Sequence, residues 1–249
     1  MEKKSIETFI KKYTLAGSIE GVLWQNVNNN LSVTAMTGDR KLFASVQSEN
    51  SATFFTGVEI GIQDTNKLRK MLAPLSDNIS LTLDVDEKDA TRVRKLTADD
   101  GKISIDYVTA AKDVIDPSPT MKSLPPFTVE LTLTPKFVDG FSKAFSALSD
   151  DKLLFTFIMS KKKNKLEMVL GYKSNLSDRI AMEVDAVSGK DVVSAPISFN
   201  AKHLKEILTA NSEVENPILS VSEAGLASIK FDSGDFKSQY YLVKIDVED

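Results

Sequence analysis

Apolar residues spaced three and four positions apart predict four helices in this chain. Near the start, Ile6, Phe9, Ile10 and Tyr13 follow the spacing that places side chains on one face of a helix. Three later segments repeat this spacing, with apolar positions at Leu68, Met71, Leu72 and Leu75, at Phe137, Phe141, Phe145 and Leu148, and at Leu204, Ile207 and Leu208. Thr134-Pro135 and Asn200 precede the last two segments and are typical helix starts.

Alternating apolar and polar positions, with many β-branched residues, predict strands in most of the remaining chain. The predicted strands of the first half are residues 31–35, 42–46, 53–62, 79–85 and 103–108. Those of the second half are residues 153–159, 166–172, 179–184, 218–221, 227–231 and 239–245. The lysine-rich residues 161–165 are predicted to form a solvated turn between two of these strands. The fold class that follows is α+β with antiparallel sheets.

A proline-rich segment near the midpoint predicts two domains. Residues 113–127 contain Pro117, Pro119, Pro125 and Pro126, which favour an extended connector over a helix or a central strand. We therefore expect one domain over residues 1–112, a linker over 113–127 and a second domain over 128–249. Each domain has an ordinary size.

The spacing of the helices indicates that the two halves are duplicates. Phe9 and Phe141 are 132 residues apart, and Leu68 and Leu204 are 136 residues apart. The second helix of each half is also similar in sequence, TNKLRKMLAPLSDN at 65–78 and AKHLKEILTANSEV at 201–214. Each half thus repeats the order helix, strands, helix, strands, which indicates a duplicated domain rather than a short repeat.

The charges are distributed unevenly between helices and strands. The chain has a formal net charge of −4, but residues 3–16, 64–75, 136–148 and 200–211 hold eleven Lys or Arg against four Asp or Glu. Four basic helices in an acidic chain favour a shared anionic partner, and without base-reading motifs the expected contacts are to phosphates. The candidate DNA contacts are Lys4, Lys11, Lys12, Lys67, Arg69, Lys70, Lys136, Lys143, Lys202 and Lys205. The alternative is that lysines decorate solvated helix faces.

Signals of enzyme chemistry are scarce, so we predict no catalysis, cofactor or metal. The chain has no Cys, and the sole histidine, His203, is expected to face solvent or phosphate. The acidic residues of segment 84–89 lack the glycine and final glutamate of an EF-hand, which favours a solvated turn. The start of the chain lacks an apolar signal segment and no run could span a bilayer. The expected location is the cytoplasm, or the host cytoplasm if the protein is viral.

Three C-terminal segments resemble DNA sliding clamps of the proliferating-cell-nuclear-antigen type, and phage T4-type clamps most of all. They are SFNAKHLKEILTANSE (198–213), LSVSEAGLASIKFD (219–232) and SQYYLVKID (238–246). The resemblance implies two similar domains, each with two helices inside and sheet outside. It also implies that three copies close into a ring around duplex DNA, with no enzyme activity. A clamp loader would place the ring on DNA, and the ring would tether a replicative polymerase.

The resemblance further implies two sets of contact residues. Short C-terminal peptides of the polymerase and the clamp loader would bind a groove at Leu42, Val114, Ile115, Leu226, Tyr241 and Leu242. The strand at 103–108 of one subunit would pair with the strand at 179–184 of the next, through Ile103, Ile105, Tyr107, Ile180, Met182 and Val184. In one respect the chain departs from cellular clamps, because the turn from Gly225 to Ala227 lacks their proline.

Two alternatives from other classes stay open at this point. The protein could be a monomeric processivity factor that binds DNA without encircling it. It could also be a β-rich viral structural or assembly protein, in which the basic helices are incidental. An enzyme is a distant third hypothesis.

Overall fold

A computed structural model describes residues 2–49, 51–116, 123–148, 153–160, 165–172, 178–184, 186–188 and 195–246. The chain divides into two compact units, one built mainly from residues 1–38 and 44–120 and the other mainly from residues 121–231 and 239–249. Two short segments are exchanged, because residues 39–43 belong to the second unit and residues 232–238 to the first. Part of the expected linker, residues 117–122, lies outside the described residues, and the domain boundaries stay a prediction.

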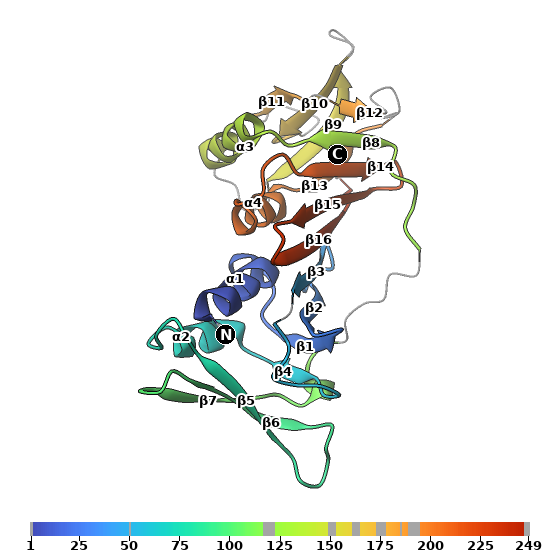
Figure 1. The fold of residues 1–249 in the computed structure, drawn as a ribbon. Helices are drawn as coiled ribbons and strands as arrows, with labels where there is room; N and C mark the ends of the chain where they lie inside the picture. Colours follow the sequence, from blue (N-terminus) through green and yellow to red (C-terminus); the bar gives the residue numbers. More distant parts are fainter. Residues whose placement is uncertain are drawn as a thin grey trace. The chain divides into compact units, whose positions relative to one another are not determined.

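All four predicted helices form (Figure 1). They are α1 (Lys3–Thr14), α2 (Thr65–Leu72), α3 (Pro135–Leu148) and α4 (Ala201–Ala210). At the N-termini of α2, α3 and α4, a side chain accepts a hydrogen bond from a backbone N–H group that the first turn of the helix leaves unpaired. Asp64 accepts from Lys67 N (2.8 Å), Thr134 from Phe137 N (3.2 Å) and Asn200 from His203 N (3.2 Å). The predicted starts at Thr134 and Asn200 are confirmed.

The first unit contains two antiparallel sheets. One has the order β3-β2-β1-β4 and the other the order β5-β6-β7. The strands are β1 (Val22–Val27), β2 (Asn30–Met36), β3 (Leu42–Ser48), β4 (Ile60–Ile62), β5 (Ser80–Val85), β6 (Val93–Asp99) and β7 (Ser104–Val108). Short 3₁₀ turns follow α1 (Leu15–Gly17) and β7 (Lys112–Val114).

The second unit also contains two antiparallel sheets, with the orders β11-β10-β9-β13 and β12-β8-β14-β15-β16. The strands are β8 (Val129–Thr132), β9 (Leu154–Ser160), β10 (Lys165–Leu170), β11 (Ile180–Glu183), β12 (Ala186–Ser188), β13 (Ile197–Asn200), β14 (Ile218–Ser222), β15 (Leu226–Asp232) and β16 (Phe236–Val243). The turn predicted between β9 and β10 falls on residues 161–164, outside the described part of the chain.

The two units repeat one topology. In the first unit β1 pairs with β2 and with β4, and in the second β9 pairs with β10 and with β13. β3 and β11 therefore occupy equivalent outer positions. The second helix of each unit is followed by a meander, β5-β6-β7 or β14-β15-β16, so that β7 and β16 are also equivalent. The predicted duplication extends to strand order.

Several strand predictions differ from the structure. Of the strand predicted over residues 53–62, only Ile60–Ile62 is strand, because the preceding residues form a packed loop. There the rings of Phe54 and Phe55 lie 4.7 Å apart, and Asn26 Nδ2 donates to the carbonyls of Ala52 (2.8 Å) and Phe55. The sequence patterns missed β1, β6, β8, β12 and β13.

Each unit has a buried tyrosine hydroxyl in its core. In the first, Tyr13 from α1 accepts from Trp24 Nε1 of β1 (3.2 Å) and lies 3.5 Å from Thr65 Oγ1 of α2. Burial raises the pKa of Tyr13 far above its usual range, against the opposing effect of its hydrogen bonds with Thr65 and Trp24, so the hydroxyl stays protonated. In the second unit, Asn211 Nδ2 donates to Tyr240 Oη (3.0 Å).

Replacing Tyr13 with Phe should destabilise the first unit by about 1–3 kcal/mol, because the buried Trp24 N–H loses its acceptor. Urea unfolding followed by Trp fluorescence measures this, since the chain has one Trp. Tyr172→Phe supplies a control at a half-buried position. An equal unfolding free energy for Tyr13→Phe and wild type would refute the role of this network.

Candidate functional site

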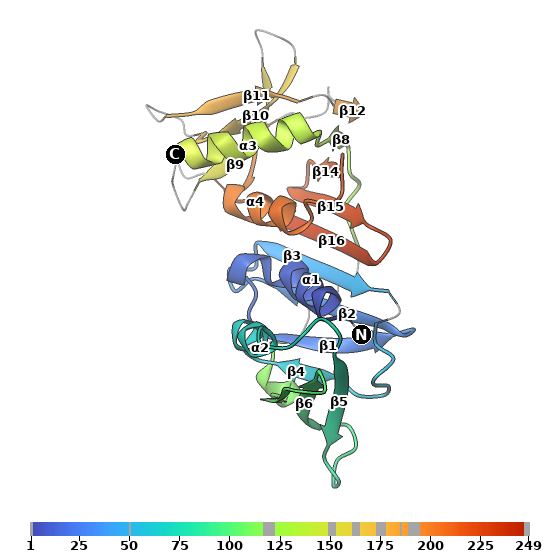
Figure 2. The ribbon, with the colours of Figure 1, turned by 60° about the vertical axis from the view of Figure 1, so that its left-hand side comes forward.

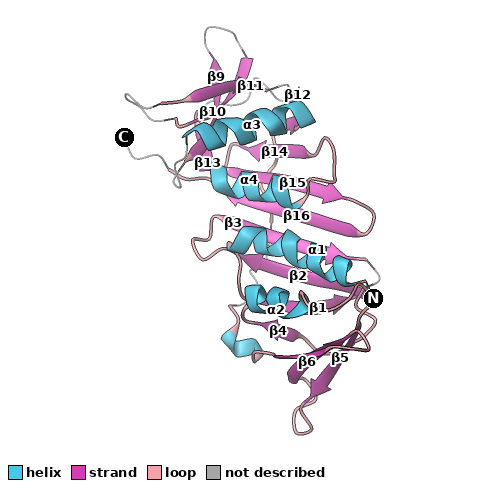
Figure 3. Cartoon of the chain, turned by 90° about the vertical axis from the view of Figure 1, so that its left-hand side faces the viewer, coloured by secondary structure: helices cyan, strands magenta, loops and turns pink. Residues whose placement is uncertain are grey.

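The two helices of each unit lie side by side (Figure 3). Basic side chains lie on their exposed faces. α1 contacts α2 in the first unit, and α3 contacts α4 in the second. Many of their apolar residues are buried, Phe9 and Leu204 completely. The exposed basic residues of the four helices are Lys4, Lys11, Lys67, Arg69, Lys70, Lys136, Lys143 and Lys202. The amphipathic pattern thus leaves each unit with a basic helical surface.

Two predicted DNA contacts lie elsewhere than expected. Lys12 is only 1% exposed, and its ammonium lies 5.4 Å from the ring centroid of Phe236. A buried side chain cannot reach a phosphate, so Lys12 leaves the candidate set. Lys205 is half-buried, with its ammonium 4.5 Å from the ring centroid of Phe145, a cation–π contact between α4 and α3.

His203 was expected to face solvent or phosphate, and that expectation is wrong. Its side chain is buried, with Nε2 3.4 Å from Asp39 Oδ2 and Nδ1 3.9 Å from Glu206 Oε2. Two carboxylates thus surround the imidazole inside the second unit. On α3, Lys143 forms an exposed ion pair with Asp139 (2.7 Å). This pairing weakens the positive potential of α3 relative to that of α2.

Two outer strands, β7 and β11, have one edge that pairs with no strand in the described part of the chain. Thr109 N donates to Arg94 O (3.1 Å), and N–H directions alternate along a strand, so the N–H groups of Asp106 and Val108 point away from β6. Val184 N donates to Leu166 O (3.3 Å), so the N–H groups of Ala181 and Glu183 point away from β10 by the same argument.

The predicted interface side chains divide between the two faces of these strands. Tyr107 is buried inside its own unit, where its hydroxyl accepts from Asp64 N (3.1 Å) and donates to Asp64 O (3.2 Å). It therefore anchors the start of α2 and is not available to a neighbour. Ile103 is exposed but precedes β7. Val108 is 75% exposed but was not among the predicted interface residues. It is the last residue of the predicted strand, and the alternating pattern does not distinguish it. The partly exposed residues at the two edges are Ile105, Ile180, Met182 and Val184.

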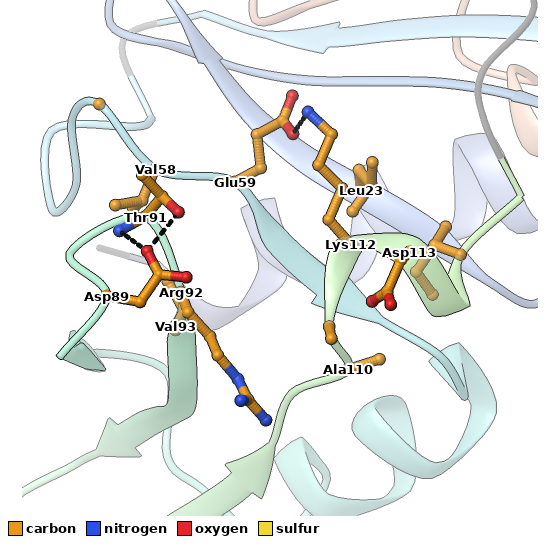
Figure 4. A pocket seen from close by; sticks show the side chains of 13 residues that line it. Leu23, Val58, Glu59, Asp89, Thr91, Arg92, Val93, Ala110, Lys112 and Asp113 are labelled. Carbon is orange, nitrogen blue, oxygen red and sulfur yellow. Dashed lines mark hydrogen bonds and ion pairs between the residues drawn. The ribbon is translucent and has the colours of Figure 1, made fainter. Parts of the chain in front are cut away.

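A cavity of about 930 Å³ lies in the first unit beside the start of the expected linker (Figure 4). Leu23 and Ile115 form part of its apolar wall, and Glu59 and Lys112 form an ion pair (2.5 Å) at its rim. Burial alone would raise the pKa of Glu59. The hydrogen bonds from Lys112 and Gln25 outweigh it and hold that pKa below its usual value.

The candidate groove residues differ in accessibility. Leu42 and Leu242 are 0% and 1% exposed, so they are core residues and leave the candidate set. Alternation along their strands turns them inward. Val114 is 58% exposed, and Ile115 lines the cavity of Figure 4. In the second unit, Leu226 is partly exposed and Tyr241 lies against Phe43, with ring centroids 5.9 Å apart.

Asp100 ties the β6–β7 hairpin to the segment after α2. Its carboxylate accepts N–H groups from Ser76 (2.7 Å), Ile103 (2.7 Å) and Lys102 (2.8 Å). These backbone bonds, with that from Ser76 foremost, hold the pKa of Asp100 well below its usual range. These hydrogen bonds stabilise the turn before β7, the strand whose outer edge pairs with no strand in the described part of the chain.

Asp100→Asn should lower stability at neutral pH. Since the folded pKa lies below the unfolded pKa of about 3.9, the contribution is fully present above that value and is lost as pH falls through the folded pKa. Urea unfolding at pH 7, 4 and 3 should show the gap to wild type shrinking with acid. Asp232→Asn, which alters a carboxylate bonded to one turn N–H (Gly234, 3.0 Å), is the control. A pH-independent gap would contradict this assignment.

The acidic segment 84–89, which begins in β5, forms hydrogen bonds and an ion pair. Asp89 Oδ1 accepts from Thr91 N (3.0 Å), and Asp84 pairs with Arg94 (2.8 Å). Within the described residues no cluster of three or more His, Asp or Glu is placed to hold a metal ion. No helix in the described part is long and apolar enough to cross a membrane.

Comparison with solved structures identifies the fold as that of a DNA sliding clamp. Proliferating cell nuclear antigen (PCNA) of Entamoeba histolytica superimposes with a TM-score of 0.70 at 18% identity, covering 98% of this chain and 96% of that chain. PCNA of A. fulgidus, in a structure with the C-terminal region of FEN-1, gives 0.70 at 13%, covering 100% and 98%.

PCNA of Thermococcus kodakaraensis gives 0.68 at 14%, covering 98% of each chain. No family model matches the sequence, and no curated protein matches it. The predicted fold class, a duplicated α+β clamp fold, is confirmed.

Proposed function

We propose that this protein is a non-enzymatic sliding clamp, which encircles duplex DNA and tethers a replicative polymerase. The observation that carries the proposal is the basic surface on the paired helices of both units, in a chain with the clamp fold. Lysine ammonium groups on exposed helix faces suit phosphates of any sequence, as a protein that slides requires. Lys70 on α2 and Lys202 on α4, both exposed, are the principal contacts proposed.

Ring closure is proposed from the duplication. Residues that end or flank β3 and β16 are hydrogen-bonded. Val243 N donates to Lys41 O (2.9 Å) inside the second unit, and Glu49 N donates to Asp235 O (2.9 Å) inside the first. β11 is equivalent to β3, and β7 is equivalent to β16. We propose that β7 of one copy pairs with β11 of the next in the same manner. Three copies would close a ring, and closure would remove both free edges.

Partners are proposed to dock through short C-terminal peptides. The structure with the C-terminal region of FEN-1 concerns the A. fulgidus protein. For this chain, Val114 and Leu226, which reach the surface, remain candidate contacts for peptides of the polymerase and of a clamp loader. Ile115 and Tyr241 remain candidates as well, although they are only 6% and 7% exposed. An exposed Val114 offers apolar area that a peptide side chain would bury. A phage origin and a location in the host cytoplasm stay predictions.

A primer-extension assay with the cognate polymerase on a primed circular template tests the function. Added protein should lengthen the products made in one binding event. Val114→Glu should reduce this effect about tenfold by placing a charge in the docking surface. Val27→Glu, at another exposed valine of the first unit, is the matched control. Products whose length does not depend on the protein would contradict the proposed function.

A further inference from the structure

A second cavity, of about 300 Å³, lies in the second unit at the C-terminal end of α4 and the N-terminal end of α3. Its apolar wall includes Leu133, Val138, Leu208 and Phe231. Three of these, Leu133, Leu208 and Phe231, are core residues, so the cavity opens directly onto the core. Its size is sufficient for one large apolar side chain.

The loop that closes this cavity, residues 211–217, is held at both ends. Asn211 Nδ2 donates to Ile207 O (2.9 Å) and to Tyr240 Oη (3.0 Å). At the other end, Leu133 N donates to Pro217 O (2.9 Å). Because both ends are bonded to regular structure, the wall is in place before any ligand arrives. A preformed wall costs a ligand less ordering entropy.

The charged residues on the lining of this cavity are acidic. Asp139 and Glu215 are on its lining, and no Lys, Arg or His is among the lining residues that the structure describes. Lys143 pairs with Asp139, while Glu215 is exposed to solvent. Beside the lining residue Pro217, Ile218 presents further exposed apolar surface. The exposed carboxylate of Glu215 at the rim is complementary to a cation.

The cavity is separate from the candidate peptide contacts near the C-terminus. β15 begins at Leu226 and reaches Phe231 five residues later. A strand rises by about 3.3 Å per residue, so the two side chains lie roughly 17 Å apart along it. A ligand here would leave Leu226 and Tyr241 free.

We propose that this acidic-rimmed pocket docks a basic-apolar segment of a partner protein. One large apolar side chain would enter the cavity between Val138 and Phe231, and a neighbouring Lys or Arg would pair with Glu215. The site gives the chain a second docking surface, independent of whether the protein encircles DNA.

Peptide-display selection against the full chain tests this proposal. Enriched peptides should carry a large apolar residue next to Lys or Arg. Fluorescence anisotropy of a labelled enriched peptide should show affinity about tenfold weaker for Glu215→Lys. Val138→Trp, which fills the cavity, should weaken it similarly. Glu223→Lys, a charge reversal on the β14–β15 turn, should bind as wild type does.

Three results would overturn the proposal. One is the absence of any enriched peptide, and another is an enriched set that is acidic. The third is equal binding to wild type, Glu215→Lys and Val138→Trp, which would place the peptide elsewhere. Glu215 is exposed, so its reversal leaves the core intact and the test does not depend on Val138→Trp folding.

Discussion

Reversing Lys70 and Lys202 to Glu is expected to weaken DNA binding by about two orders of magnitude at physiological salt. Both ammonium groups are exposed on α2 and α4, and every copy in a ring would lose two phosphate contacts. Each lost contact also lowers the slope of log affinity against log salt by about one. Binding to a duplex of arbitrary sequence at several salt concentrations measures both effects.

Lys88→Glu with Lys230→Glu is the matched control for this experiment. It makes the same change in net charge at exposed positions off the helices, the turn after β5 and strand β15. If the control pair loses as much affinity as Lys70→Glu with Lys202→Glu, binding depends on net charge alone. The helical surface would then not be the DNA interface.

Proline at Asp106 and Val108 together should abolish association of the subunits. Both N–H groups point away from β6, so proline removes donors for a neighbouring strand but no backbone hydrogen bond to β6. The free energy of unfolding of the first unit should change little. Sedimentation velocity should find only the 27.4 kDa single chain for the variant, and its retention on DNA should be lost.

Alanine at the same two positions separates side-chain from backbone effects. Asp106 forms bonds with Lys95 (2.9 Å) and Thr97 (2.7 Å), and both variants lose them. The alanine pair keeps the outward N–H groups and should still associate. If the proline and alanine pairs behave alike, the outer edge of β7 is not where subunits meet.

The helices could be predicted because their determinants are local. Four apolar stripes and the caps at Thr134 and Asn200 lie within single segments, and the structure places each helix within a few residues of its predicted range. The loop before β4 could not be predicted in this way. Phe54 and Phe55 have the composition of a strand, but Asn26, from β1, bonds the loop carbonyls and holds them in a turn. Tertiary contacts here override propensity.

In the candidate sites, too, features with local determinants could be predicted and features that depend on tertiary contacts could not. Helical phase correctly separates the exposed Lys70 and Lys202 from the buried stripe. Helical phase cannot predict the burial of Lys12 or of His203. Lys12 lies against Phe236 and His203 lies beside Asp39, and both neighbours come from distant parts of the sequence. The inward orientation of Tyr107 likewise depends on Asp64, which caps α2. The sequence directly gives the charge of a residue, but whether another group buries that residue depends on contacts between distant segments.

Encirclement of DNA is the central claim, and covalent closure of the ring tests it most directly. The chain has no Cys, so Val108→Cys with Ala181→Cys introduces the only thiols, one beside each proposed pairing edge. The variant is mixed with nicked circular DNA, and neighbouring copies are joined by a short bismaleimide. The cross-linked protein should remain on the circle in high salt and be released when the DNA is cut once. Release from the intact circle by salt would contradict encirclement.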